Sequence, residues 1–298
     1  MNKLLAIIIM LATPGLAYAS QCSKHFTLDQ LEALKKAKFE IKLADKRNKI
    51  APKLLACLGH KDPKIRDGVV YEASSYWLRN QLLAPETIKT MFNDLVNAME
   101  QPNQDDDNFT QPFAALVFSE VVRADRVAPY LSDGERQKAV GVATRYMQNI
   151  TDYRGFDETD GWRHAVAHTA DVFLQLSLNK NISKAQLNQM LSAIEGQVSP
   201  SNQHAYLFGE PKRLAMAFIY IVLRGEHTAA EITQFVDKLT NPAPFSNWGS
   251  VYNSKQGLAK LHNTRHFIYS IFAITGQSKN PKLKAIQPTL AKAIKQLG

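Results

Sequence analysis

The sequence has few of the features that mark the common functional classes. It holds only two cysteines, Cys22 and Cys57, in 298 residues. It contains no Gly-x-Ser-x-Gly nucleophile motif and no glycine-rich phosphate loop. Beyond the first nineteen residues, no stretch reaches the roughly 18 to 20 apolar residues that a membrane-spanning helix needs. No pattern of basic and aromatic residues indicates a nucleic-acid partner.

Strand patterns are also absent. Runs of alternating β-branched residues are missing, and most segments between Gly, Pro or Asn show apolar residues three and four apart. This spacing predicts an all-α fold. The predicted helices cover residues 27–44, 47–58, 63–80, 85–100, 109–127, 133–149, 161–178, 183–197, 210–224, 228–239, 254–275 and 281–297. Asp62, Ser132, Asp160, Ser183 and Thr228 are placed to cap helix starts.

The predicted helices form pairs at a nearly constant spacing. The first helix of successive pairs begins near residues 63, 109, 161, 210 and 254. A period of about 40 to 47 residues, slightly stretched here, is typical of HEAT and armadillo solenoids. The segment Asp62–Ala73, with its Asp-Pro start and Arg-Asp pair, resembles a HEAT repeat in detail. We therefore expect residues 20–298 to form one HEAT/armadillo-like α-solenoid domain of about six helical pairs.

The N-terminus has the pattern of a secretory signal peptide. Lys3 precedes the apolar run Leu4–Leu11, and Ala17 and Ala19 flank Tyr18 in a small-x-small cleavage pattern. We expect residues 1–19 to be removed and the mature chain, from about Ser20, to be exported to the periplasm or secreted. After signal removal no transmembrane segment is expected.

Export places both remaining cysteines in an oxidising compartment, where a disulfide persists. A Cys22–Cys57 bridge would close a loop of 36 residues (57 − 22 + 1), worth roughly 3 to 4 kcal/mol in the chain-entropy model. Two free thiols are the alternative. The formal net charge is +9 and falls to +8 when Lys3 is removed. Such a basic exported protein is expected to be attracted electrostatically to anionic envelope polymers or lipid head groups.

The stretch Tyr153–Asp171 concentrates polar residues at the start of one predicted helix. If the helix begins at Gly161, then His164, His168, Asp160 and Asp171 share one face, and Trp162 lies on the opposite, core-facing side. The histidines should then face solvent or a groove.

Polar residues gather in the same way on the first helix of each pair. Equivalent helices of a solenoid stack side by side, so these residues should line one long surface. The predicted ligand-binding residues are Glu72, Glu120, Arg123, Asp160, Arg213, Tyr220, His262, Arg265, His266 and Tyr269. His, Arg, Tyr and Asp suit planar hydrogen bonding and stacking. The alternative is the ordinary solvated face of amphipathic helices.

The run Gly161–Asp171, GWRHAVAHTAD, resembles the Gly-Trp-x-His-x-x-Ala-His-x-Ala-Asp stretch of the domain-of-unknown-function family 2785. The preceding Arg154-Gly155-Phe156 and the segment Asp62–Ala73 resemble corresponding parts of that family. The resemblance implies a HEAT-like helical fold with a focal point at Trp162, His164, His168 and Asp171. It implies no activity. Many members of the family look cytoplasmic, and the signal-like N-terminus here departs from them.

Three functions fit these residues. The first is a binding module whose groove holds a protein, a peptide or an envelope polymer, and it is our leading prediction. The second is a hydrolase or lyase in which His164, His168 and Asp171 perform acid–base catalysis. The third gives that enzyme a divalent metal on His164 and His168, four residues apart, with Glu120 or Glu210 as a further ligand. The metal pattern is weak, because Ala165 stands where a metalloprotease has its glutamate.

Overall fold

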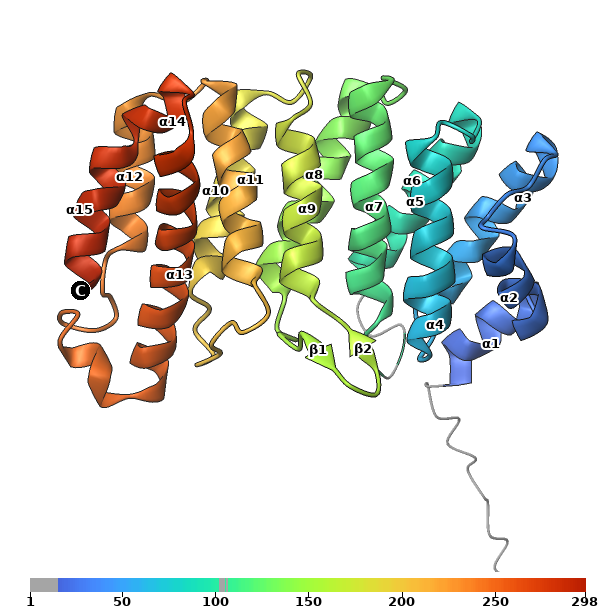
Figure 1. The fold of residues 1–298 in the computed structure, drawn as a ribbon, viewed down its shortest axis with the longest axis horizontal. Helices are drawn as coiled ribbons and strands as arrows, with labels where there is room; N and C mark the ends of the chain where they lie inside the picture. The colour runs from blue at the N-terminus through green and yellow to red at the C-terminus, as the bar shows by residue number, and fades with distance from the viewer. Residues whose placement is uncertain (1–15, 102–104, 106) are drawn as a thin grey trace, which may run out of the picture.

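The computed structural model describes residues 16–298 except 102–104 and 106, and these residues are mostly helical (Figure 1). The all-α prediction is confirmed. None of the helices in this described part combines the length and the hydropathy needed to cross a bilayer. Residues 1–15 of the predicted signal peptide lie outside the described residues, and residues 16–19 belong to the first described helix.

The helices follow one another with short connections. Their bounds are Leu16–His25 (α1), Leu28–Lys36 (α2), Ala44–Leu54 (α3), Leu55–Cys57 (η1), Pro63–Ile65 (α4), Arg66–Tyr71 (η2), Glu72–Arg79 (α5), Pro85–Glu100 (α6), Thr110–Val127 (α7), Asp133–Asn149 (α8), Ala165–Ser177 (α9), Lys184–Val198 (α10), Glu210–Arg224 (α11), Ala229–Leu239 (α12), Ser250–Asn253 (η3), Lys255–Gln277 (α13), Pro281–Ala285 (α14) and Gln287–Leu297 (α15). The segment η2 is a π-helical turn, and η1 and η3 are 3₁₀ turns.

From α5 onward the helices lie in two rows. In one row α5, α7, α9, α11 and α13 stand side by side, each packed on the next (Figure 1). In the other row α6, α8, α10 and α12 pack in the same order. The N-terminal helices α1 to α3 lie at one end of this array, and α14 and α15 lie at the other. Buried aliphatic and aromatic side chains form a core between the rows.

Local sequence signals set most helix starts. Asp62 caps α4 by accepting from the backbone N–H of Lys64. Ser132, Ser183 and Thr228 each form a capping box with the residue three positions on. These caps satisfy backbone donors that the first helical turn leaves without partners. The first helices of successive pairs begin at Pro63, Thr110, Ala165, Glu210 and Lys255, within one residue of the predicted starts except for α9.

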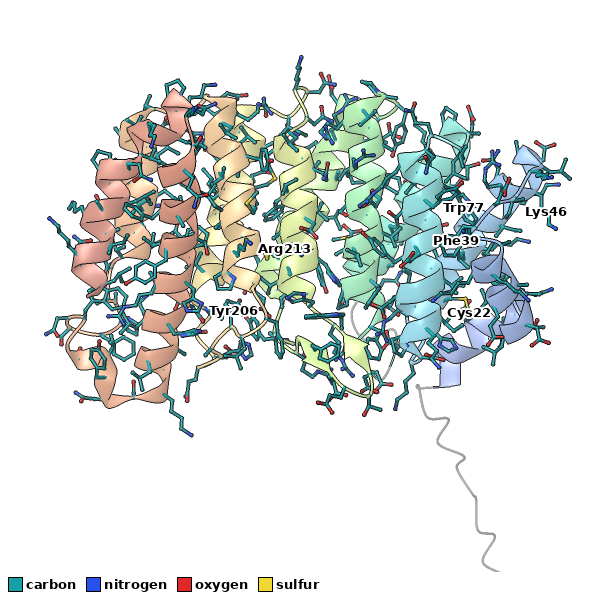
Figure 2. The ribbon with its side chains drawn as sticks, viewed as in Figure 1. Cys22, Phe39, Lys46, Trp77, Tyr206 and Arg213 are labelled. Carbon is teal, nitrogen blue, oxygen red and sulfur yellow. A yellow bond between two sulfur atoms is a disulfide. The ribbon has the colours of Figure 1, made fainter. Side chains whose placement is uncertain are left out.

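Several predicted helices are divided: the one expected over 63–80 becomes α4, the π-helical turn η2 and α5, and the one expected over 47–58 ends in the 3₁₀ turn η1. The helix expected over 27–44 ends at Lys36, and Lys38 and Phe39 adopt left-handed backbone angles. The turn buries the Phe39 ring, and the Phe39 carbonyl accepts a hydrogen bond of 2.8 Å from the indole of Trp77 (Figure 2). The last predicted helix is divided into α14 and α15 at Ile286.

A β-hairpin replaces the predicted start of the helix at 161. Phe156–Asp157 (β1) pairs antiparallel with Gly161–Trp162 (β2), so Phe156 lies opposite Trp162. Helix α9 begins only at Ala165, and Asp160 does not cap it. The expectation that no strand is present is wrong here, because Gly161 adopts a positive φ of 73° that suits the hairpin and not a helix.

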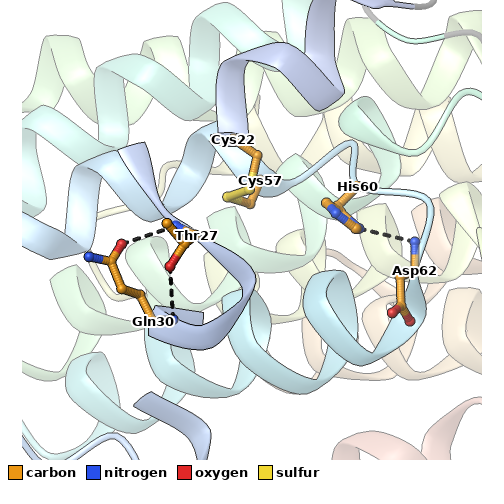
Figure 3. The surroundings of a disulfide bond; sticks show 6 residues. All are labelled: Cys22, Thr27, Gln30, Cys57, His60 and Asp62. Carbon is orange, nitrogen blue, oxygen red and sulfur yellow. Dashed lines mark hydrogen bonds between the residues drawn. A yellow bond between two sulfur atoms is a disulfide. The ribbon is translucent and has the colours of Figure 1, made fainter. Parts of the chain in front are cut away.

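The predicted disulfide is present. Cys22 of α1 is bonded to Cys57 of η1, and both residues are buried (Figure 3). The bond ties α1 to the 3₁₀ turn that follows α3, next to the capping box of Thr27 and Gln30.

We expect the Cys22→Ser/Cys57→Ser variant to lose about 2–4 kcal/mol in the free energy of unfolding, because the unfolded chain gains the freedom of an open loop. Denaturant unfolding of both proteins in the absence of reductant measures this difference. Addition of a reductant should lower the stability of the wild type and leave the variant unchanged. Equal stability of wild type and variant would contradict a structural role for the bond.

Candidate functional site

The buried guanidinium of Arg66 fixes the segment that leads into α9. Its Nη2 donates to the carbonyl of Asp160 at 2.7 Å, to the carbonyl of Trp162 at 3.3 Å and to the Asp67 carboxylate at 2.9 Å. Its Nη1 donates to the carbonyls of His60 and Lys61. The hairpin is thus attached to the turn before α4, far away in the sequence.

Two cations share one aromatic ring at this junction. The guanidinium carbons of Arg66 and Arg163 lie 3.8 and 4.2 Å from the centre of the Phe109 ring. Arg163 also donates to the Asp107 carbonyl at 2.9 Å and to the Asp160 carboxylate at 3.3 Å. The predicted ligand residue Asp160 is therefore used to hold the hairpin in place.

His164 ends this extended segment in a left-handed conformation, with φ 58° and ψ 37°. Its carbonyl accepts the first hydrogen bond of α9, from the backbone N–H of His168 at 3.0 Å. A left-handed backbone costs energy in a residue other than glycine. The contacts of the hairpin hold His164 in this conformation.

The His164 ring is buried, which corrects the prediction that it faces solvent or a groove. Trp162 stacks on it, with ring centres 4.7 Å apart and planes at 23°. Its Nε2 makes no hydrogen bond with any described residue and lies 3.6 Å from Oε1 of Glu210. Because the helix starts four residues later than predicted, Trp162 lies outside the helix and is 38% exposed, whereas we expected it to face the core.

His168 is a buried residue of the helix packing, again contrary to prediction. Its Nδ1 lies 3.0 Å from the Pro112 carbonyl of α7, which makes Nδ1–H the donor in the neutral ring. Its ring contacts Phe113 edge to face at 5.4 Å and the His164 ring at 5.7 Å. His168 therefore links α9 to α7.

Burial determines the charge of this cluster. Desolvation and the nearby Arg213 lower the pKa of His164 to about 4. Desolvation and the neighbouring His164 lower the pKa of His168 to about 3. Desolvation raises the pKa of Glu210, while the backbone N–H of Phe208, a donor at 3.0 Å, acts in the opposite direction. Both histidines are neutral at neutral pH.

The cluster does not form a recognisable metal centre. No group of three His, Cys, Asp or Glu residues that could hold a metal ion occurs among the residues the structure describes. Glu120, one of the expected further ligands, is instead paired with Arg79, at 2.9 Å from its Nε.

Several predicted groove residues pair across neighbouring helices of the α5–α13 row. Arg79 of α5 binds both carboxylate oxygens of Glu120 of α7 through its Nε and Nη2. Arg213 of α11 (labelled in Figure 2) binds Asp171 of α9 in the same way. These bidentate pairs are of the strong, oriented kind. They connect successive helices, so much of the polar surface is already satisfied internally.

The remaining predicted residues are spread along the row. His262 and His266 of α13 lie together, with ring centres 4.1 Å apart, and His262 Nε2 is 3.0 Å from the Tyr206 carbonyl. Arg265 donates to the Leu297 carbonyl at the end of α15. The others, partly or fully accessible on their helices, are Glu72, Arg123, Tyr220 and Tyr269.

Sequence reasoning missed an exposed aromatic cluster beside His164. Phe156 and Phe208 lie 5.1 and 6.0 Å from Trp162, measured between ring centres, and are 46% and 38% exposed. Leu207, beside Phe208, is 73% exposed. We call these four residues the aromatic patch. The available sequence signal was apolar residues in non-helical segments, Gly155-Phe156 and Leu207-Phe208-Gly209.

The buried histidines should make stability depend on pH. In the unfolded chain they bind protons below their ordinary pKa of 6.5, but in the folded chain only near 4 and 3. Their contribution to the free energy of unfolding is therefore retained completely above pH 6.5. It falls as the pH drops toward 4, with a slope of up to about 1.4 kcal/mol per pH unit for each histidine.

The His164→Gln/His168→Gln variant should show a shallower slope between pH 6.5 and 4, measured by urea unfolding at a series of pH values. A matched control is His25→Gln, because His25 is exposed on α1, and its slope should equal that of the wild type. A double variant with the full wild-type slope would show that these histidines do not cause the effect.

Comparisons with known proteins identify a family and no activity. The family model described as "Protein of unknown function (DUF2785)" matches residues 85–273, a range that contains Gly161–Asp171 and Arg154–Phe156 but not Asp62–Ala73. A search of curated proteins and a search of solved structures each found no match. Because the matched range covers more than half of the chain, the protein belongs to the DUF2785 family.

Proposed function

We propose that this protein is an exported HEAT-like α-solenoid that binds a peptide segment of a protein partner. The two rows of helices, with equivalent helices packed side by side, support the solenoid assignment. Solenoids of this kind offer an extended surface to their partners. The observation that carries the binding role is the aromatic patch, in which Phe156 and Phe208 each contact the Trp162 ring and all three rings remain partly open to solvent.

The patch has the composition of a recognition centre. Aromatic residues at interfaces bury large areas with little loss of side-chain entropy, and they dominate measured hot spots. Trp162 sits in the middle of the patch, supported from behind by the stacked His164 ring. The Arg66 contacts to the backbone of Asp160 and Trp162 keep this support rigid. A preformed surface loses less entropy on binding than a mobile one.

The charges next to the patch favour a basic partner segment. Asp157 and Glu158 follow Phe156 at the hairpin turn, and both are exposed. Hydrogen bonds from the backbone of Asp160 and Thr159 lower the pKa of Asp157, which keeps it ionised. We infer a ligand in which a large apolar side chain contacts Trp162 and a neighbouring Lys or Arg contacts the acidic turn.

The histidine-centred hydrolase or lyase is the weaker candidate. An unpartnered His164 Nε2 beside Glu210 is the type of pair that acid–base catalysis uses. Trp162 covers the His164 ring, however, and His168 is engaged with Pro112. A substrate would have to displace Trp162 before a proton could be transferred.

The Trp162→Ala substitution tests the binding role. Screening the purified protein against a synthetic peptide array that varies apolar and Lys/Arg positions should select peptides combining both. Trp162→Ala should lower the affinity for the selected peptides at least about tenfold, since aromatic hot spots contribute about 2 kcal/mol or more to binding. Fluorescence anisotropy measures the affinities.

A suitable control is Tyr76→Ala, because Tyr76 has the same exposed fraction of 38% but lies on α5, away from the patch. It should bind the selected peptides like the wild type. Asp157→Asn should lower the affinity for the basic peptides and leave the affinity for uncharged versions of them unchanged. Selection of acidic peptides, or equal loss in both alanine variants, would contradict the proposal.

Export is tested separately through the N-terminus. Expressed with all 298 residues in a bacterial host, the protein should appear in the periplasm or medium with Ser20 as its first residue, as read by intact mass. An Ala17→Arg/Ala19→Arg variant should keep its N-terminus, because signal peptidases require small residues at these positions. Unprocessed wild type confined to the cytoplasmic fraction would rule out export.

A further inference from the structure

A cavity of about 580 Å³ opens beside the start of α9, between the end of α6, the start of α7, the end of α8 and the loop that follows α8. Its volume falls within the range of small-molecule sites in proteins. It does not include the aromatic patch, so it is independent of the proposed peptide site.

Among the described residues, the charged side chains that line the cavity are paired. Asp105, whose carboxylate acts on the Tyr146 phenol, accepts hydrogen bonds from the backbone N–H groups of Phe109 and Thr110. Arg145 of α8 forms an ion pair with Glu100 of α6. Asp152 accepts from Nε of Arg154 at 2.9 Å. Neither charge pair leaves a cation or an anion free to attract a ligand of opposite sign. The wall therefore favours an uncharged molecule, since a charged one would lose hydration without gaining a counter-charge.

Uncharged hydrogen-bonding groups line the same space. Tyr146 is nine-tenths buried, and burial raises the pKa of its phenol, so the hydroxyl stays protonated as a donor. Tyr146, Asn149 and Thr151 all line this cavity. Gln111 donates to the Met99 carbonyl at 3.0 Å, which leaves its amide oxygen as an acceptor.

Apolar side chains form the rest of the wall. Met99, Val142 and Ile150 contribute aliphatic surface next to the amides and hydroxyls. A sugar ring presents the same combination, with C–H groups on its faces and hydroxyls at its edge.

The family motif shapes one side of this cavity. Ala165, the first residue of α9, lines it because the left-handed His164 directs the chain there. Pro112 also lines it, and its carbonyl is the partner of His168 Nδ1. His164 and His168 thus position two residues of the wall, although neither histidine lines the cavity itself.

We propose that this cavity binds an uncharged, hydroxyl-rich ligand of one or two sugar rings. Tyr146, Asn149 and Thr151 supply the hydrogen bonds, and the aliphatic wall packs on the C–H face of the ring. Acidic sugars and amino sugars bind more weakly than their neutral counterparts, because the ion pairs leave no free charge for them.

The test is a ligand-observed NMR screen of the purified, unligated protein against glucose, N-acetylglucosamine, cellobiose, maltose, lactose and trehalose, with glucuronic acid and glucosamine as charged counterparts. At least one neutral sugar should bind with a Kd on the order of 10 mM or lower, which corresponds to weak binding. Tyr146→Phe and Asn149→Leu should each weaken it by roughly 3- to 10-fold, the loss of one hydrogen bond.

The matched control is Tyr76→Phe, which changes an exposed tyrosine on α5 outside the cavity and should leave the affinity unchanged. Circular dichroism and thermal melting confirm that each variant is folded. The proposal is wrong if no neutral sugar binds, if a charged sugar binds more tightly than its neutral counterpart, or if Tyr146→Phe and Tyr76→Phe bind alike. A negative result would not contradict the proposed peptide site, since Trp162 lies outside this cavity.

Discussion

The completely buried guanidinium of Arg66 is the interaction on which the functional region depends. A buried charge is costly unless hydrogen bonds and a counter-charge satisfy it. Here four backbone carbonyls, the Asp67 carboxylate and the rings of Phe109 and Phe113 surround it. The carbonyls belong to the turn before α4 and to the hairpin, so satisfying Arg66 requires those segments to meet.

The placement of Gly161–Asp171 follows from this constraint. With the backbone of Asp160 and Trp162 held by Arg66, the chain enters α9 through a left-handed His164. His164 then lies beneath Trp162, and His168 reaches the carbonyl of Pro112. The histidines stabilise the junction between α7, α9 and α11. The bidentate pairs of Arg79 with Glu120 and of Arg213 with Asp171 continue the same cross-linking along the row.

Two accessible features remain beside this rigid junction, and they differ in chemistry. The aromatic patch on the hairpin and on the loop before α11 is apolar and adjoins acidic residues, which suits a basic peptide segment. The cavity beside Ala165 has paired charges, amides and hydroxyls in its wall, which suits the small uncharged ligand proposed above. Both include a residue of Gly161–Asp171, Trp162 in the patch and Ala165 in the cavity. One stretch of sequence thus supports two different surfaces through a shared buried framework.

The sequence by itself determined the helices, their caps and the disulfide partners. Ser132, Ser183 and Thr228 cap the helices within three residues, and apolar spacing is likewise a local property. The hairpin, the burial of the histidines and the exposure of Trp162 were decided only by the tertiary structure. The contacts that enforce them join Arg66 to residues 94 and 96 positions away. Helical periodicity placed His164 on an open face, because no local pattern in Gly161–Asp171 reveals that distant carbonyls and rings hold its backbone out of the helix.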